Sequence, residues 1–191
     1  PRWPETDMAI VSDIQTEPPP NRALFIGARL FVAADAFFFL GFLFAYLYLR
    51  ALNSNGLWHP PHTNPSGALA TVSLVAVVAA AVIVRVADDR RAQMAAAAAT
   101  VLVLVAAVCE GVQLFDPGFS PIHAGGYGAV FVGFTAGFTV HLLGAAYWLE
   151  TIAADRTTEV GLRLRELRAA LVFVTFLAVV AVIATILFYL V

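Results

Sequence analysis

Apolar residues are gathered in five long runs, and the stretches between them are short and polar. Each run has roughly the 20 residues that an α-helix needs to cross the hydrocarbon core of a bilayer. The pattern therefore predicts an all-α protein, a polytopic membrane bundle of five transmembrane helices. The expected spans cover residues of about 23–49, 67–87, 93–115, 127–149 and 168–190.

The composition agrees with this fold class. Of the 191 residues, 61% are hydrophobic and 13% are charged, a mixture that excludes an ordinary water-soluble domain. Residues 1–21 carry acids and prolines where a signal peptide would need an apolar segment, so we expect a polar tail there and a membrane domain over 22–191. The net charge of −2 and the absence of a basic cluster give no reason to expect a nucleic-acid partner.

The arginines predict the orientation in the membrane. The eleven basic residues are all arginines, and ten of them lie near the span ends that share one side, whereas only Arg50 lies on the other side. Because basic residues are concentrated in cytoplasmic loops, we expect the N-terminus in the cytoplasm. Five spans then place the C-terminus outside.

Three strongly polar, titratable side chains lie within the expected spans: Asp35, Glu110 and His141. At the rise of a helix, Asp35 lies on the order of 12 Å, and His141 on the order of 14 Å, from the same membrane edge. Glu110 lies roughly 27 Å from that edge, where water or lipid headgroups can reach it without a protein partner. We therefore expect Asp35 to hydrogen-bond His141 across the first and fourth spans.

Three interpretations of this pair remain open. It is a structural contact that fixes the rotation of two helices, since such contacts contribute about 0.6 kcal/mol on average. Alternatively it takes up and releases protons, the usual significance of an ionisable group inside a membrane. In the third interpretation the two residues do not form a pair, and the carboxylate faces a partner subunit.

Small residues on the fourth span indicate a helix–helix contact. Gly133, Gly137 and Gly144 share a face with His141, at spacings of four, four and three residues. Because glycines four residues apart allow two helices to approach closely, this face is expected to contact protein.

Motifs of an independent enzyme are not found in the sequence. There is no P-loop, no G-x-S-x-G and no metalloprotease motif, and we expect no catalytic residue in this chain. Only one of the four histidines, His141, lies at membrane depth, too few for a haem centre. His59 and His62 in a loop, without a nearby acid or thiol, are a weak signal for a metal site.

The first span and the loop after it resemble a known family. The stretch GARLFVAADAFFFLGFLFAYLYLR, followed by WHPP, is similar to the first span of the short, five-helix form of subunit III of haem-copper cytochrome c oxidases. Members typically have a Glu where Asp35 stands, then a Phe-Phe pair, an Ala-Tyr near the outer end and a Trp-Pro-Pro loop. The matching residues, with His59 inserted in the loop, are Phe37, Phe38, Phe39, Ala45, Tyr46, Trp58, Pro60 and Pro61.

A second block resembles the same family. GVQLF at 111–115 is similar to its G-x-Q segment, and YGAVFVGFTAGFTVHLLG at 127–144 to its YGSxF…TGFHGLHVxxG helix. The residues that match without gaps are Tyr127, Gly128, Phe131, Thr135, His141 and Gly144.

Four departures indicate a divergent member. Phe138 replaces the first histidine of that helix and Thr139 the glycine after it. The last span lacks the YWHFVD stretch, and Asp35 is one methylene shorter than the usual Glu. It is therefore open whether the host complex reduces oxygen or nitric oxide.

The resemblance implies an accessory subunit without redox centres. Such a chain packs against the catalytic subunit I and subunit II of a respiratory terminal oxidase in the plasma membrane, the inner membrane of a bacterium. The complex transfers electrons from cytochrome c or a similar donor to oxygen and translocates protons. Haem and copper are expected in the partner and phospholipid in a cleft of this chain, which supports assembly and sustained proton uptake. Asp35 takes the position of the buried glutamate and His141 that of the retained histidine.

Two other function classes remain open. A stand-alone proton-coupled transporter would use Asp35 and His141 as a relay, but it would need polar residues at several depths, and the sequence shows one deep cluster. A membrane scaffold or assembly factor would copurify during assembly and be lost from the mature complex.

Overall fold

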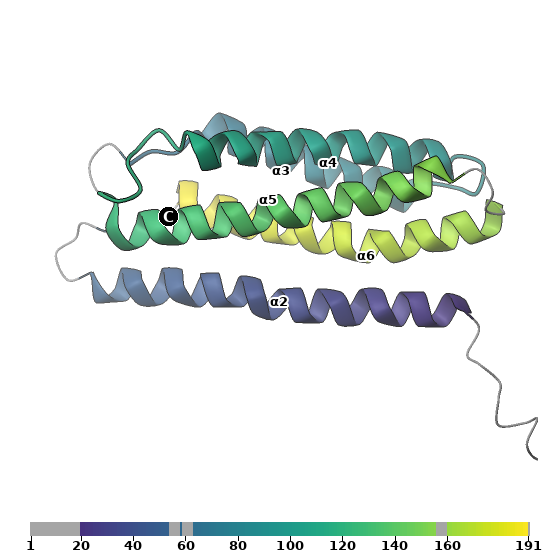
Figure 1. The fold of residues 1–191 in the computed structure, drawn as a ribbon, viewed down its shortest axis with the longest axis horizontal. Helices are drawn as coiled ribbons and strands as arrows, with labels where there is room; N and C mark the ends of the chain where they lie inside the picture. Colours follow the sequence, from purple (N-terminus) through teal and green to yellow (C-terminus); the bar gives the residue numbers. More distant parts are fainter. Residues whose placement is uncertain (1–19, 54–57, 59–62, 156–159, 191) are drawn as a thin grey trace, which may run out of the picture.

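The computed structural model describes residues 20–53, 58, 63–155 and 160–190. This part of the chain forms five long helices that run side by side, alternately up and down (Figure 1). They are α2 (Pro20–Leu52), α3 (Gly67–Val86), α4 (Ala92–Phe115), α5 (Gly125–Ala154) and α6 (Val160–Thr185), and α6 continues into a π-helical turn, η1 (Ile186–Leu190). Each of the five is long and apolar enough to span a membrane, as the sequence predicts.

The helices reach beyond the apolar runs that predict them. α6 begins at Val160, well before the expected start of the span at 168, and α5 continues to Ala154. The added part of α6 contains LRLREL, and Leu, Arg and Glu all favour helix. Arginines at such a helix end extend their charged groups toward the headgroups. An apolar run therefore marks the part of a helix suited to hydrocarbon, whereas the helix itself extends further.

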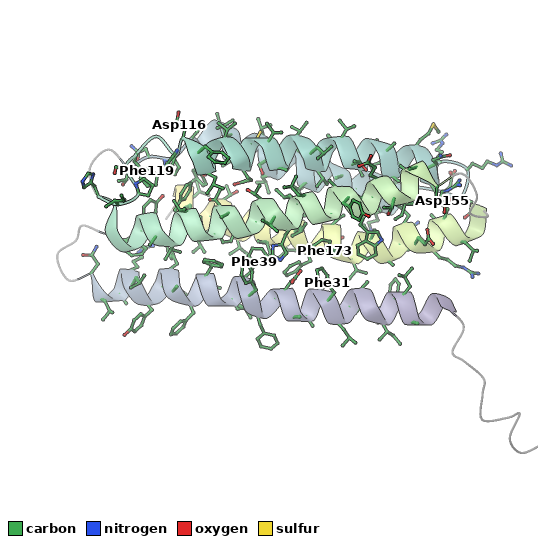
Figure 2. The ribbon with its side chains drawn as sticks, in the orientation of Figure 1. Phe31, Phe39, Asp116, Phe119, Asp155 and Phe173 are labelled. Atoms are coloured by element: carbon green, nitrogen blue, oxygen red, sulfur yellow. The ribbon has the colours of Figure 1, made fainter. Side chains whose placement is uncertain are left out.

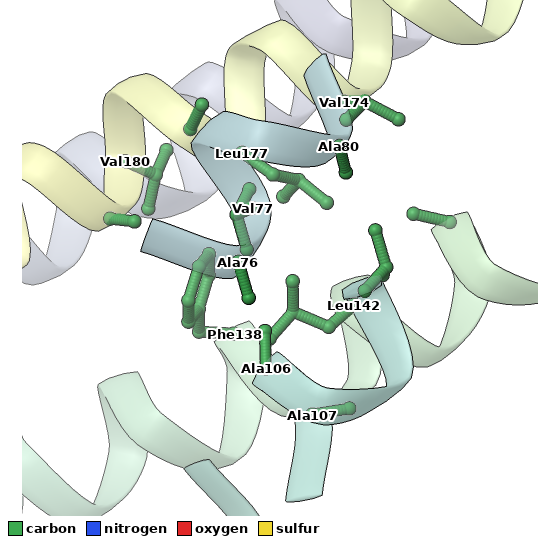
Figure 3. Packing of buried hydrophobic residues seen from close by; sticks show 14 of the residues in the cluster. Ala76, Val77, Ala80, Ala106, Ala107, Phe138, Leu142, Val174, Leu177 and Val180 are labelled. Atoms are coloured by element: carbon green, nitrogen blue, oxygen red, sulfur yellow. The ribbon is translucent and has the colours of Figure 1, made fainter. Parts of the chain in front are cut away.

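Small side chains bring α3, α4 and α5 close together. Ala76 and Ala80 of α3 and Ala106 of α4 are almost completely buried, and they pack around Leu142 of α5 and Leu177 of α6 (Figure 3). Without a hydrophobic driving force between helices in lipid, close van der Waals contact of small residues is a main source of association. The centre of the bundle is therefore an alanine-rich interface.

α2 lies at one side of the bundle and packs mainly against α5 and α6 (Figure 1). Only 11% of its most apolar segment is buried, against 44% for α5. A groove of about 190 Å³ separates part of α2 from α6, and its walls include Phe39, Leu43, Phe176 and Ile183. α2 is thus attached along a narrow strip of contacts.

Arginine side chains connect the ends of helices where most basic residues lie. Arg168 of α6 donates hydrogen bonds to the carbonyl oxygens of Arg85 (2.5 Å) and Ala87 (3.1 Å) at the end of α3. These are carbonyl groups that a helix end leaves without an internal partner. Arg163 donates similarly to the carbonyl oxygen of Asp155, at 2.7 Å. Arg50, at the end of α2, lies at the opposite end of the bundle.

Tyrosines connect the helices at that opposite end. The Tyr46 hydroxyl of α2 donates to the carbonyl oxygen of Leu187 at 2.7 Å, and the Tyr127 hydroxyl of α5 donates to that of Phe188 at 3.4 Å. Both carbonyls belong to η1, where the wider π-helical turn interrupts the regular hydrogen-bond ladder. The tyrosines thereby hold the end of α6 against α2 and α5.

We expect Tyr46→Phe to lower stability by about 1 kcal/mol, because the ring still packs while the carbonyl of Leu187 loses its donor. Thermal unfolding of the purified protein in detergent measures this change. Tyr48→Phe is the matched control, since Tyr48 is 53% exposed and removal of its hydroxyl should have little effect. Equal melting temperatures for the two variants would contradict a stabilising role for the Tyr46 hydrogen bond.

Candidate functional site

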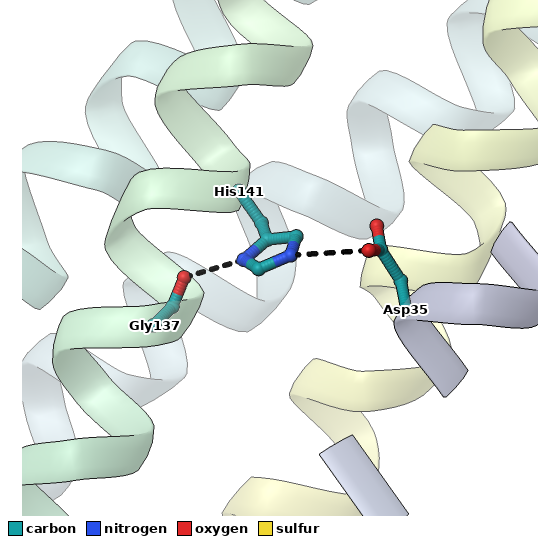
Figure 4. Close-up of polar contacts among 3 residues, drawn as sticks. All are labelled: Asp35, Gly137 and His141. Carbon is teal, nitrogen blue, oxygen red and sulfur yellow. Dashed lines mark hydrogen bonds and ion pairs between the residues drawn. The ribbon is translucent and has the colours of Figure 1, made fainter. Parts of the chain in front are cut away.

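The structure brings Asp35 of α2 and His141 of α5 together. Nε2 of His141 lies 3.5 Å from Oδ1 of Asp35 (Figure 4). Both side chains are largely buried, with 13% of Asp35 and 17% of His141 exposed. The two helices therefore present these groups to each other inside the protein.

The other ring nitrogen of His141 is also engaged. Nδ1 lies 2.6 Å from the carbonyl oxygen of Gly137, one turn earlier on α5 (Figure 4). A carbonyl oxygen only accepts, so Nδ1 must carry a proton and donate it. Nε2 of a neutral imidazole then has a lone pair, and that lone pair faces the carboxyl group of Asp35.

This geometry favours one proton between the two side chains. With an ionised Asp35 and a neutral His141, two acceptors would face each other. A proton on Nε2 gives an imidazolium beside a carboxylate, and a proton on Oδ1 gives a carboxylic acid beside a neutral ring. In either form the contact is attractive. The pair can therefore hold and exchange a proton without rearrangement of the helices.

Aromatic rings surround the imidazole of His141. Phe38 stacks on it with ring centroids 5.3 Å apart, and Phe39 meets it edge to face at 5.0 Å. Phe173 of α6 lies 6.4 Å away on a third helix. Phe173 also meets Phe31 of α2, with ring centroids 5.1 Å apart (Figure 2). Such rings exclude water and also attract a cationic imidazolium through their negative faces.

One oxygen of Asp35 has no partner. Oδ2 is buried and makes no hydrogen bond in the part of the chain that the structure describes. A buried carboxylate oxygen without a donor is costly, whereas a protonated carboxyl group needs fewer donors. Oδ2 is the position at which a further donor would complete the site.

Two of the three glycines expected at the helix contact do pack there. A Cβ at Gly133 would lie 2.9 Å from the Phe42 ring, and a Cβ at Gly137 would lie 2.9 Å from the Phe38 ring. At both positions an added Cβ would require a phenylalanine ring of α2 to move. Two phenylalanines of α2 packed against two glycines of α5 thus form one part of the narrow contact strip.

Gly144 does not make the expected helix contact, because nothing lies within 4 Å of the position that a Cβ would occupy there. It shares the glycine face of α5, but an open groove lined by Leu24, Gly27, Phe31 and Trp148 lies between α2 and α5 at this end. Spacing along a helix predicts the face of a residue, but it does not predict where the neighbouring helix diverges.

Glu110 lies in a different environment from the one expected. It was expected to reach water or headgroups without a partner, yet it lines a small cavity inside the bundle with Ser73 of α3 and Tyr189 at the end of α6. Its height along α4 agrees with the expectation, near the end of the helix. The rotation of α4, which height alone does not determine, turns the side chain inward.

Sequence reasoning missed a hydrogen bond close to this cavity. The Tyr189 hydroxyl donates to Oε1 of Gln113 at 2.5 Å, and Gln113 is completely buried. Gln113, an amide within an apolar span that also carries Glu110, is the signal that could have indicated this contact. Tyr189 looks like a residue of the aromatic belt at a membrane interface, which hides its inward contact.

Among the described residues, no group of three or more His, Cys, Asp or Glu side chains could hold a metal ion. His59 and His62 lie outside those residues. No family model matches the chain. No curated protein matches it either. The assignment of a function thus depends on the residues and their arrangement.

Proposed function

We propose that this chain is an accessory subunit of a respiratory terminal oxidase of the haem-copper type, corresponding to the short form of subunit III. The observation that carries the proposal is the contact between Asp35 and His141. These two residues come from the two sequence blocks that resemble the family, and they meet on helices far apart in the chain. The redox chemistry, with its haem and copper, would take place in subunit I, with subunit II as a further partner.

In this proposal the pair exchanges protons within a subunit that has no active centre of its own. The pair would lose its proton to an acceptor, or regain one from a donor, that reaches the free oxygen Oδ2 of Asp35. Asp35 and His141 would thereby support proton uptake by the partner during sustained turnover.

The proposal includes an orientation and a location. The end of the bundle with Arg85, Arg163 and Arg168 would face the cytoplasm, and the end with Arg50 and η1 would face outward. The membrane would be the plasma membrane, the inner membrane of a bacterium. The N-terminus is then cytoplasmic and the C-terminus outside.

A structural phospholipid is part of the proposal. The groove between α2 and α6 has almost entirely apolar walls and a volume of about 190 Å³, which suits a segment of an acyl chain. Its lining extends over several turns of both helices, from Ala36 to Tyr46 on α2 and from Phe176 onward on α6, as contact with a lipid tail in a bilayer requires. The lipid would fill the space that leaves α2 loosely attached.

Copurification tests the proposal. A tag on this chain, gentle detergent extraction, a visible absorption spectrum and mass spectrometry should give haem bands together with an oxidase catalytic subunit. A colourless protein that stays folded alone would contradict the proposal and favour a small proton-coupled transporter. If this chain copurifies with the oxidase only during assembly and is absent from the mature complex, the result would favour an assembly factor.

A further inference from the structure

A second group of polar side chains lies inside the bundle, away from Asp35 and His141. Ser73 of α3, Glu110 of α4 and Tyr189 at the end of α6 surround one cavity near the end of the bundle that carries η1. Thr135 of α5 and Thr185 of α6 also line it, and the other walls are apolar. Four helices therefore contribute hydrogen-bonding groups to one enclosed space.

The hydroxyl of Ser73 has no partner although it is deeply buried. Ser73 is 1% exposed, and its Oγ makes no hydrogen bond within the described part of the chain. Hydroxyls of serine inside membrane helices commonly bond to their own backbone, as Thr185 does to the carbonyl oxygen of Ala181. Ser73 instead lines the cavity together with Glu110, without a direct hydrogen bond between the two side chains. Its hydroxyl therefore requires a partner from the cavity.

The cavity has the size of one water molecule. Its volume is about 20 Å³, and a cavity needs roughly 10–15 Å³ to hold a water, together with two to four polar partners. Ser73 and the carboxyl group of Glu110 supply two. The Thr185 hydroxyl supplies a third, because its proton is used toward Ala181 and its lone pairs are free to accept.

We propose that this cavity holds one water molecule that bridges Ser73 and Glu110, and that Glu110 is a site of reversible protonation separate from the Asp35–His141 pair. The proton is taken from water and returned to water, so that a carboxylate and a hydronium ion give a carboxylic acid and water. The proposal does not depend on membership in an oxidase. It requires only the cavity and its polar lining.

Other titratable groups near Glu110 do not compensate its charge. Tyr189 faces it from α6, and Cys109 precedes it on α4. Tyr127 of α5 interacts with Tyr189 and donates to a backbone carbonyl. None of these groups is a cation. The protonation of Glu110 therefore depends on the bridging water and on exchange with solvent.

The bridging water is tested with two substitutions of Ser73 whose new side chains have nearly the same shape. Ser73→Thr keeps the hydroxyl and Ser73→Val replaces it with a methyl group, so their difference isolates the hydrogen bond. If a water bridges Ser73 and Glu110, the Thr variant melts at a higher temperature than the Val variant, by roughly 2–4 °C. If the cavity is dry, the Val variant is at least as stable as the Thr variant, which overturns the proposal.

The protonation is tested by infrared spectroscopy of the full chain in lipid, over a series of pH values. The difference between wild type and Glu110→Gln should contain the carbonyl band of a protonated carboxylic acid, which weakens as the pH rises and shifts in heavy water. The same band should persist in Asp35→Asn. A difference spectrum with carboxylate bands alone at every pH, or a band that vanishes in Asp35→Asn, would overturn the assignment to a separate site.

Discussion

Replacement of Gly133 and Gly137 by leucine should release α2 from the bundle. Each added side chain begins with a Cβ 2.9 Å from the ring of Phe42 or Phe38, and the remaining atoms extend into the same space. Overpacking of this kind costs roughly 1–3 kcal/mol at each position. Because α2 packs mainly against α5 and α6 along a narrow strip, the loss of these two contacts leaves it held chiefly by Tyr46, the Asp35–His141 pair and the rings around that pair. Thermal unfolding in detergent should show a lowered melting temperature or a separate early transition.

Gly144→Leu is the matched control for these substitutions. It is the same change on the same face of α5, but the space beside it is open. Leucine is also a better helix former than glycine, by about 0.5–1 kcal/mol. The control should therefore be as stable as the wild type or slightly more stable. A double variant as stable as this control would show that the glycines do not determine the attachment of α2.

Under the proposed function, Asp35→Asn should reduce sustained turnover of the oxidase several-fold while the complex still assembles. Asparagine has nearly the shape of aspartate, and its amide can donate to Nε2 of His141, so the contact between α2 and α5 persists. The proton that the pair holds at Nε2 or Oδ1 is lost, however, because an amide does not titrate. Activity and proton uptake should be followed through many turnovers at several pH values, with the amount of assembled complex as the reference.

Asp35→Glu separates the proton role from a role in packing. It restores a carboxyl group, so it should recover turnover even where the longer side chain slightly lowers stability. Turnover of Asp35→Asn equal to wild type at every pH would leave the pair a structural contact only. A double-mutant cycle with Asp35→Ala and His141→Ala then measures that contact, and additive losses of stability would mean that the two residues do not interact.

The helices and the height of each polar group could be predicted from sequence. Five apolar runs predict five helices, and the rise per residue places Asp35 and His141 at matching depth. Their contact at 3.5 Å agrees with that estimate. Height follows from the chain alone because every helix rises by nearly the same step per residue across the same layer.

Rotation and separation of the helices could not be predicted. Glu110 faces a cavity because of the way α4 packs on α3 and α5, and Gly144 is exposed because α2 and α5 diverge. In a chain that is apolar on nearly every face, the hydrophobic pattern does not distinguish the face toward lipid from the face toward protein. The carbonyls that Tyr46 and Tyr127 bind lie in the last turn of the helix, where such groups lack an internal partner, and the pattern does not show which side chains reach them.

The packing of α2 against the distant α5 and α6 has a consequence for biogenesis. Synthesis proceeds from the N-terminus, so α2 enters the bilayer before the helix that carries His141 has been made. During that interval the carboxyl group of Asp35 is without its partner, at a cost of roughly 2.5–3.5 kcal/mol near the centre of a helix. The mean hydropathy of 2.1 along this span, to which exposed residues such as Phe37 and Phe44 contribute, offsets the cost. The exposed phenylalanines of α2 thus favour insertion of the nascent helix before the helix that carries His141 is made.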